Sequence, residues 1–297
     1  MSRLFADVRL ALKSLRRRPG YAAIAIITLA LGIGANTAVY SLVRGVLLRP
    51  LPYRDPGTLA VLWKGPPSSG ETTWLSANEV RAYGQEVRAF AGVDAWIGLS
   101  ANLTGGGEPE RVVASGMTPG LFRTLGVTPA LGTGFAAATG GAPEVVISHG
   151  LWQRRFGGER DIVGRSVVVN GVARTVVGVL PRDFTLPLEF GESRPSEVFV
   201  PVPLDSAGFQ GWGNRSFIAV ARLAPGATFA QASAQMQAVE AGWMRQGFIQ
   251  GGRKLGRAAV GAETFVLGDA RNVIAILAGA VAMILLIACA TVANLTL

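Results

Sequence analysis

Two long stretches without a charged side chain lie near the two ends of this 297-residue chain. Neither Tyr21–Val43 nor Asn272–Leu297 contains Asp, Glu, Lys, Arg or His. A helix rises about 1.5 Å per residue and the hydrocarbon core of a bilayer is about 30 Å thick, so each stretch is long enough to cross it. The sequence therefore predicts two transmembrane helices, over residues 21–46 and 271–297, and one large domain between them, over residues 47–270.

Basic side chains are concentrated before the first of these stretches. The formal net charge of the chain is +9, and residues 1–20 contribute six basic side chains against Asp7. Apolar residues recur at helical spacing in the same segment, which predicts an amphipathic basic helix on a membrane surface. It fits either a positive flank that only fixes topology or a docking element for a cytoplasmic partner, and both interpretations stay open. The basic residues in this interpretation are Arg9, Lys13, Arg16, Arg17 and Arg18.

The position of these charges predicts the orientation of the chain. Basic residues beside a transmembrane helix favour the cytoplasmic side, so we expect residues 1–20 to be cytoplasmic and residues 47–270 to be outside. A cleaved signal peptide is the main alternative, but its apolar region is about 7–15 residues long. The first stretch is longer and lacks a clean Ala-x-Ala site, which favours an uncleaved anchor. Anionic lipid is the expected contact of the basic segment, and no face suits nucleic acid.

Small residues recur at intervals of four within both predicted transmembrane helices. Ala30, Gly34 and Ala38 form this pattern in the first helix, and Ala275 and Gly279 form it in the second. Small side chains let helices approach closely, which matters because lipid provides no hydrophobic reason for helices to associate. We therefore expect these positions to be helix contacts. The polar residues expected to face protein rather than lipid are Asn36 and Asn294, the second of which also fits a place near the inner headgroups.

The domain between the two helices is predicted to be α+β. Ser76 with Glu79, and Thr228 with Gln231, are capping-box pairs, so helices are expected to begin there. They should end near Arg88 and Met244. Strands are expected over residues 58–63, 93–103, 111–115, 216–222 and 258–266, with a short helix from Thr118–Pro119 through Leu125.

Residues 126–210 follow a different, β-rich pattern. A strand over 144–147 precedes a short helix that Ser148 should cap. Asn170–Gly171 lies between two β-branched runs and predicts a hairpin with a type I′ turn, because that turn needs φ > 0 at both central residues. Pro195, Pro201 and Pro203 predict a loop-rich return. We interpret this order as a strand–helix layer that a β-rich insertion interrupts.

The sequence lacks the residue patterns of common enzymes. No Gly-rich loop ends in Lys-Ser or Lys-Thr, so the chain is not expected to hydrolyse nucleotides. Gly132–Ala137 matches a dinucleotide fingerprint only loosely. His149 is the only histidine and is expected to be an ordinary residue at a helix start, while Cys289 is the only cysteine and lies in the second apolar stretch. The usual zinc ligand sets are thereby excluded. We expect no catalytic site, no metal and no cofactor on this chain.

Several motifs along nearly the whole chain are similar to those of one family when taken together. The motifs are LKSLRRRP (12–19), LGIGANTAVYSLV (31–43), ASGMTPGLFRTLGVTPALGTGF (114–135), VVISHGLWQRRFGG (145–158), DIVGRSVVVNG (161–171), TVVGVLP (175–181), FIAVARLAPGATFAQASAQM (217–236) and IACATVANLTL (287–297). Together they resemble the MacB/FtsX-type permeases of ABC transporters, in the form without a fused nucleotide-binding domain.

This resemblance implies a fold. It implies an extracytoplasmic domain with a porter-like α/β part over residues 47–125 and 211–270, and an inserted β-rich subdomain over residues 126–210. Two transmembrane helices should flank the domain. In this family further spans normally follow, so the chain is expected to be the N-terminal portion of a longer permease.

The resemblance also implies a function. Such permeases sit in the bacterial inner membrane as dimers beside a separate cytoplasmic ATPase, which uses the ATP. The chain is therefore expected to be a non-catalytic permease subunit that couples ATP hydrolysis to movement of a periplasmic domain, for export or mechanotransmission, with a periplasmic partner or cargo. The alternative is a membrane-anchored periplasmic ligand-binding or scaffold protein without transport. An anchored exterior enzyme is a third hypothesis, which the missing catalytic residues disfavour.

Overall fold

The chain divides into two compact units in the computed structural model, residues 1–50 with 269–297 and residues 51–268. The structure describes residues 51–64, 74–105, 107–136, 143–187, 189, 194–209, 211–248, 257–262 and 264 of the second unit. In the first unit it describes residues 19–20, 23, 26–27, 30, 32–34, 36–38, 41, 276–277, 279–283 and 286.

The first unit is helical at every position that the structure describes. Within the described residues, no helix combines the length and the apolar character that crossing a membrane requires. The basic residues predicted between Arg9 and Arg18, together with Ala275 and Asn294, lie outside the described residues.

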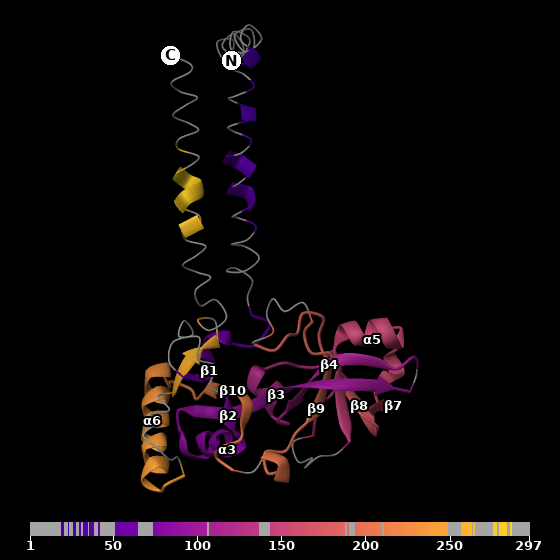
Figure 1. Ribbon diagram of the computed structural model, residues 1–297, viewed down its shortest axis with the longest axis vertical. Coiled ribbons are helices and arrows are strands. Elements are labelled where there is room, and N and C mark those ends of the chain that lie inside the picture. Colours follow the sequence, from indigo (N-terminus) through magenta and orange to yellow (C-terminus); the bar gives the residue numbers. More distant parts are fainter. Residues whose placement is uncertain are drawn as a thin grey trace. The chain divides into compact units, whose positions relative to one another are not determined.

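One mixed sheet organises the second unit, with the strand order β11-β1-β10-β3-β4-β9-β6-β8-β5 along its main path (Figure 1). Among the described residues, β2 adds to β10, and β7 pairs with both β3 and β8. The strands are β1 (Leu59–Lys64), β2 (Leu75–Ser76), β3 (Phe90–Thr104), β4 (Glu110–Met117), β5 (Leu131–Gly132), β6 (Glu144–Ile147), β7 (Ser166–Val169), β8 (Val172–Val179), β9 (Val198–Pro201), β10 (Arg215–Leu223) and β11 (Arg257–Gly261). The helices are η1 (Pro56–Thr58), α3 (Ala77–Glu86), α4 (Leu121–Leu125), α5 (His149–Phe156), η3 (Arg160–Ile162), η4 (Ala207–Phe209) and α6 (Phe229–Arg245).

Helices α3 and α6 cover one face of the part of the sheet formed by β1, β10, β11 and the first half of β3, which we call the helix-covered half. Both helices begin at the predicted capping boxes. The Ser76 or Thr228 hydroxyl accepts from the backbone N–H three residues later, and the Glu79 or Gln231 side chain accepts from the backbone N–H of the capping residue. Their apolar faces bury Tyr83, Met236 and Trp243 against Phe217 and its neighbours. The capping prediction is confirmed, because both side-chain pairs bond to N–H groups of the first helical turn that have no partner within the helix.

A second buried cluster lies on the opposite face of this sheet. Trp96 and Met117 point to this side, and α4 covers them with Phe122. The rings of Phe122 and Phe199 meet edge to face at 6.3 Å, which is a favoured geometry for aromatic pairs. Because Phe199 comes from β9, this cluster connects α4 to strands of the expected insertion.

Six strands close into a barrel, which we call the barrel throughout. β3 pairs with β4, β4 with β9, β9 with β6, β6 with β8, β8 with β7, and β7 returns to β3. Alternate residues of these strands point inward, as Val112, Val145 and Val198 do, and form one buried apolar cluster. Helix α5 packs on that cluster through Leu151, which is fully buried. The strands expected in the insertion thus form a barrel together with β3 and β4, and these two strands also belong to the strand–helix layer.

The β7–β8 hairpin has the predicted turn. Asn170 has φ 51° and Gly171 has φ 79°, so both central residues have the positive φ that a type I′ turn needs. The Asn170 side chain does more than favour this turn. Its Oδ1 accepts from the Asn102 N–H at 2.8 Å and its Nδ2 donates to the Ser100 carbonyl at 3.3 Å, so it fixes the hairpin to β3.

Two local expectations need correction. The predicted loop-rich return contains β9, a buried strand that pairs with β4 on one side and β6 on the other. Its apolar Val-Phe-Val run precedes Pro201, so the proline ends the strand rather than preventing it. The strand predicted over 258–266 ends at Gly261, and Ala262 and Thr264 are helical.

Candidate functional site

The small-residue positions of the first predicted transmembrane helix are on its exposed surface. Ala30, Gly34, Asn36 and Ala38 are helical and exposed, whereas Gly32 is buried. At about 100° per residue, Gly32 lies roughly 200° around the helix from Ala30 and so on another face. A Cβ placed at Gly34 would meet no heavy atom within 4 Å.

Gly279 in the second segment is in the same situation, since it is exposed and a Cβ there would also meet nothing within 4 Å. The described part of this chain therefore does not bring Gly34 and Gly279 together. A contact made by either glycine stays a prediction, and it would have to involve other residues or another protein.

Among the described residues, the side chain of the histidine contacts an aromatic ring. His149 is the first residue of α5, and its ring contacts that of Trp152 at a centroid distance of 5.3 Å. The neighbouring Ser148 hydroxyl accepts from the Leu151 N–H at 3.1 Å, so it caps the helix. No group of three or more metal-ligating side chains occurs among the described residues. The Gly132 segment forms no phosphate cradle, because Gly132 packs against the Val177 carbonyl.

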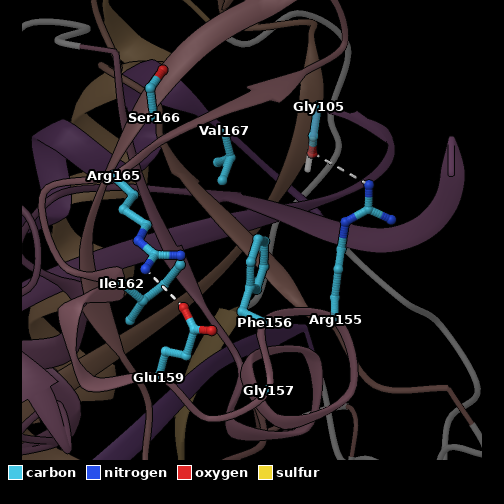
Figure 2. Close-up of a pocket in the computed structure, with 9 residues that line it drawn as sticks. All are labelled: Gly105, Arg155, Phe156, Gly157, Glu159, Ile162, Arg165, Ser166 and Val167. Atoms are coloured by element: carbon cyan, nitrogen blue, oxygen red, sulfur yellow. Dashed lines mark hydrogen bonds and ion pairs between the residues drawn. The ribbon is translucent and has the colours of Figure 1, made fainter. Parts of the chain in front are cut away.

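A cavity of about 360 Å³ opens beside the seam where β7 joins β3 (Figure 2). Its apolar wall is formed by Phe156 at the end of α5, Ile162 of η3 and Val167 of β7. Its volume falls within the range of small-ligand sites, which often lie at the mouths of barrels. The remaining lining residues are Gly105, Arg155, Gly157, Glu159, Arg165 and Ser166.

Both arginines that line this cavity already have partners within the protein. Arg155 donates to the Glu108 carbonyl at 2.9 Å and pairs with the Glu110 carboxylate at 3.3 Å, and its Nη2 is 3.5 Å from the Gly105 carbonyl. Arg165 pairs with Glu159 at 2.7 Å and with Asp161. Figure 2 shows these two arginines on either side of Phe156.

The contact between Arg165 and Asp161 shifts the pKa of both groups. Hydrogen bonding to Arg165 lowers the pKa of Asp161, and the same contact raises the pKa of Arg165. Helix α5 is tied to the barrel in a similar way, because Arg154 pairs with Glu110 and Glu197, each at 2.7 Å. The charges around the cavity are therefore balanced, and its chemistry suits an apolar group with hydrogen bonding at the rim better than a strong anion.

A partly buried acid that the sequence did not single out lies in the first half of β3. Asp94 accepts from the Thr118 hydroxyl at 2.5 Å and from the Thr124 hydroxyl at 2.6 Å. Burial raises the pKa of Asp94, and the two hydroxyl bonds and Arg123 oppose that rise. The contacts tie α4 to β3. A charged residue inside an otherwise apolar strand, Val-Asp-Ala-Trp, is the sequence signal that could have identified it.

Comparisons with known structures identify the fold. The periplasmic region of MacB from Actinobacillus actinomycetemcomitans aligns with 76% of this chain and 95% of its own, at 14% identity and a TM-score of 0.52. A domain of a protein classed as a permease from Porphyromonas gingivalis aligns over 70% and 92%, at 16% identity and a TM-score of 0.51. The extracellular domain of the noncanonic ABC-type transporter YknZ from Gram-positive bacteria aligns over 68% and 99%, at 14% identity and a TM-score of 0.48. None of the curated proteins compared with the chain matches it.

A family model supplies the relationship that these low identities cannot. The model of the MacB-like periplasmic core domain matches residues 22–239, which is most of the chain. The match includes the barrel and much of the helix-covered half, and it ends within α6, before β11. Such domains belong to permease-type proteins of ABC transporters. The mixed α/β fold with its covered sheet agrees with this match. The chain belongs to the MacB-like periplasmic core domain family.

Proposed function

We propose that this chain is a non-catalytic permease subunit of an ABC transporter, which couples ATP hydrolysis by a separate cytoplasmic ATPase to movement of its periplasmic domain. The observation that carries the proposal is the family match over residues 22–239, which begins inside the first uncharged stretch and ends within α6. Two uncharged stretches long enough to span a bilayer support an anchor at each end of the domain. In this proposal the chain sits in the bacterial inner membrane, with its N-terminus in the cytoplasm.

The same proposal assigns roles to residues outside the folded domain. Arg9, Lys13, Arg16, Arg17 and Arg18 lie on the cytoplasmic side, next to anionic lipid and the ATPase. The exposed positions Ala30, Gly34 and Ala38, with Gly279, suit close packing against a second permease copy or further spans. Export of a cargo and regulation of a periplasmic partner both fit this arrangement.

Co-purification and ATPase measurements test the proposal. The tagged full-length permease is co-expressed with an ABC-type ATPase subunit from the same organism, extracted in detergent and purified. We expect the two to elute together and the permease to change the ATPase rate. Replacement of Arg16, Arg17 and Arg18 by Gln should reduce co-elution if they dock the ATPase, whereas Gln at Arg44 and Arg49, across the predicted span, should not. A permease that never associates with an ATPase and leaves its rate unchanged would rule the proposal out.

The cavity beside β7 favours one alternative, a membrane-anchored periplasmic ligand-binding or scaffold protein without transport. In that case Phe156→Ala should abolish capture of the periplasmic ligand, and no ATPase should co-purify. A permease that stimulates an ATPase and tolerates Phe156→Ala would exclude this alternative.

A further inference from the structure

Arg222 binds a segment that directly precedes the sheet in sequence. The segment, Tyr53–Thr58, lies between the first uncharged stretch and β1, and we call it the junction segment. Arg222 lies on β10 opposite Leu59, the first residue of β1. Its Nη2 donates to the Arg54 carbonyl at 2.8 Å and its Nη1 to the Thr58 hydroxyl at 2.7 Å. One planar guanidinium thus holds both ends of a five-residue stretch, which suits its fixed fork of donors.

The backbone of the junction segment is closed on itself around Asp55. Asp55 has φ 46°, a left-handed conformation that non-glycine residues rarely adopt. Its carbonyl accepts from the Thr58 N–H at 2.9 Å and the Thr58 hydroxyl at 2.8 Å, and Arg222 Nη1 lies 3.4 Å away. A conformation of this kind persists only where its surroundings impose it. The junction segment is therefore a built turn rather than a loose linker.

The same guanidinium connects this turn to α4. Arg222 Nε donates to the Thr124 carbonyl at 2.9 Å. At the end of α4, a Cβ on Gly126 would lie 2.6 Å from Arg54 Cβ and 3.3 Å from Arg222 Nη2. Helix α4 is in turn tied to β3 through Thr124 and Asp94. A displacement of the junction segment would thus act on β10 and β3 together.

Tyr53 gives the junction segment a second attachment, to the chain that follows β8 of the barrel. Its hydroxyl donates to the Thr185 carbonyl at 2.7 Å, and the side chain is 6% exposed. Burial raises the pKa of Tyr53, and Glu189 adds to the rise, so the hydroxyl keeps its proton at physiological pH. The junction segment therefore contacts both the helix-covered half and a segment beside the barrel.

The strand that leads towards the second uncharged stretch meets the same edge of the sheet. β11 pairs with β1 in an antiparallel ladder from Ala60–Gly261 to Lys64–Arg257 (Figure 1). Among the described residues, the first strand after one apolar stretch and the last strand before the other are therefore hydrogen-bonded neighbours.

We infer that the junction segment is a rigid joint that Arg222 locks, and that Arg222 is the positioning residue through which movement of the preceding helix enters the sheet. This inference rests on the proposed function, because it names where the coupling enters the periplasmic domain. A flexible linker at the same place would instead isolate the domain from the helix.

The first measurement is amide hydrogen exchange of the full-length permease without nucleotide. Arg222→Gln should speed exchange of the Thr58 amide about tenfold or more, because hydrogen bonds to charged groups are the strong ones and the three that Arg222 donates to the junction segment would be lost. Arg222→Lys keeps the charge without the fork and should give nearly the same increase. Arg81→Gln is the matched control, because Arg81 donates to the Leu204 carbonyl at a distance of 3.0 Å, and neither residue belongs to the junction segment. Unchanged exchange at Thr58 in both Arg222 variants would overturn the joint.

The second measurement uses the permease in complex with its co-purified ATPase. Exchange of β10 amides is compared with ATP and without it. We expect ATP to change the exchange of β10 amides in wild type and in Arg81→Gln. In Arg222→Gln this change should be roughly fivefold smaller, while ATP hydrolysis continues. Should Arg222→Gln fold poorly, Thr58→Val removes the hydroxyl that accepts from Arg222 and donates to the Asp55 carbonyl, and should give a smaller loss in the same direction.

The outcomes separate the two proposals. An undiminished ATP response in the Arg222 and Thr58 variants overturns the joint and leaves the proposed function standing. Absence of any ATP response in the wild-type complex overturns the proposed function, and the transmission through Arg222 with it.

Discussion

The helix-covered half and the barrel solve the same problem, a sheet with an apolar face, in different ways. In the helix-covered half, α3 and α6 bring their own apolar stripes, and each starts at a capping box within a few residues. In the barrel, the strands curl until β7 meets β3, and the face is covered by other strands. The first solution depends on local sequence patterns. The second depends on one pairing between residues more than sixty positions apart, Leu103 with Val169.

The comparison is not between two independent domains, because β3 runs through both regions. Its first half pairs with β10, its second half pairs with β4, and its last two residues, Leu103 and Thr104, pair with β7. Loss of order in either region should therefore be felt in the other. The predictions below test this coupling and the weight of the barrel seam.

The largest expected effect comes from truncating one core side chain in each region. Leu151 in the barrel and Met236 in the helix-covered half are both fully buried. Leu151→Ala and Met236→Ala should each lower the free energy of unfolding by about 2–5 kcal/mol. Because β3 is shared, both should shift one common transition, measured on the full chain in detergent by fluorescence during guanidinium unfolding. Val163→Ala, at a 39% exposed position, is the control. Two separate transitions, each moved by one variant, would show that the regions are independent.

The next effect concerns the end of the sheet at β5. Gly132 has φ +75°, and a Cβ there would lie 2.1 Å from the Val177 carbonyl oxygen. Gly132→Ala should therefore destabilise by about 2–4 kcal/mol, from backbone overlap together with the left-handed conformation. Gly157→Ala is the matched control, since Gly157 also has a positive φ, +61°, but nothing lies within 4 Å of its Cβ. Equal shifts of the unfolding midpoint in the two variants would refute the steric explanation.

A smaller effect is expected at the barrel seam. Asn170→Ala removes two hydrogen bonds to β3 and places Ala at positive φ, so a loss of about 1–2 kcal/mol is expected. Hydrogen exchange of the Asn102 amide reports the seam directly. Asn170→Gly keeps the turn conformation and removes only the side chain. If Asn102 stays fully protected in the Gly variant, the side chain does not hold the seam.

The smallest effect is a pH dependence at Asp94. Burial raises the pKa of Asp94 in the folded chain, so the folded state binds its proton more tightly than the unfolded chain does. This contribution to stability is present below the ordinary Asp value of 3.8 and is lost as the pH rises through the raised value. Asp94→Asn cannot ionise, so its stability should fall less than that of wild type from about pH 4 upward.

Asp161→Asn supplies the control of opposite sign. Arg165 lowers the pKa of Asp161, so its contribution is present above the ordinary value and lost as the pH falls through the lowered one. Parallel pH profiles for Asp94→Asn and wild type would remove the special role of Asp94.

Local patterns predicted much of the helix-covered half from the sequence. Ser76 and Thr228 predicted their helix starts because a capping hydroxyl acts within three residues, and Asn170–Gly171 predicted its turn for a similar reason. The family match confirms the resemblance to MacB-type permeases. β9 was missed because its flanking prolines suggested a loop, whereas its pairing with β4 and β6 is set by distant residues.

The candidate sites were less predictable than the fold. The cavity beside β7 is assembled from the turn after β3, α5, η3 and β7, and no short pattern joins these segments. Arg222 and Asp94 each interrupt an apolar strand, which marks them as unusual, but their partners lie at Arg54 and Thr124 in other segments. Sequence spacing carries no information on such distances. Ala30, Gly34 and Ala38 are exposed, and a helix contact at these positions stays a prediction.

The sharing of β3 and β4 has a practical consequence for anyone who dissects this protein. Excising residues 126–210 as a module would remove four strands of the barrel and leave β4 with an unpaired, aggregation-prone edge. The excised piece would not form the barrel by itself either, because it would lack β3 and β4. Fragments for biochemical work should therefore run from Leu51 to Gly268 without an internal cut.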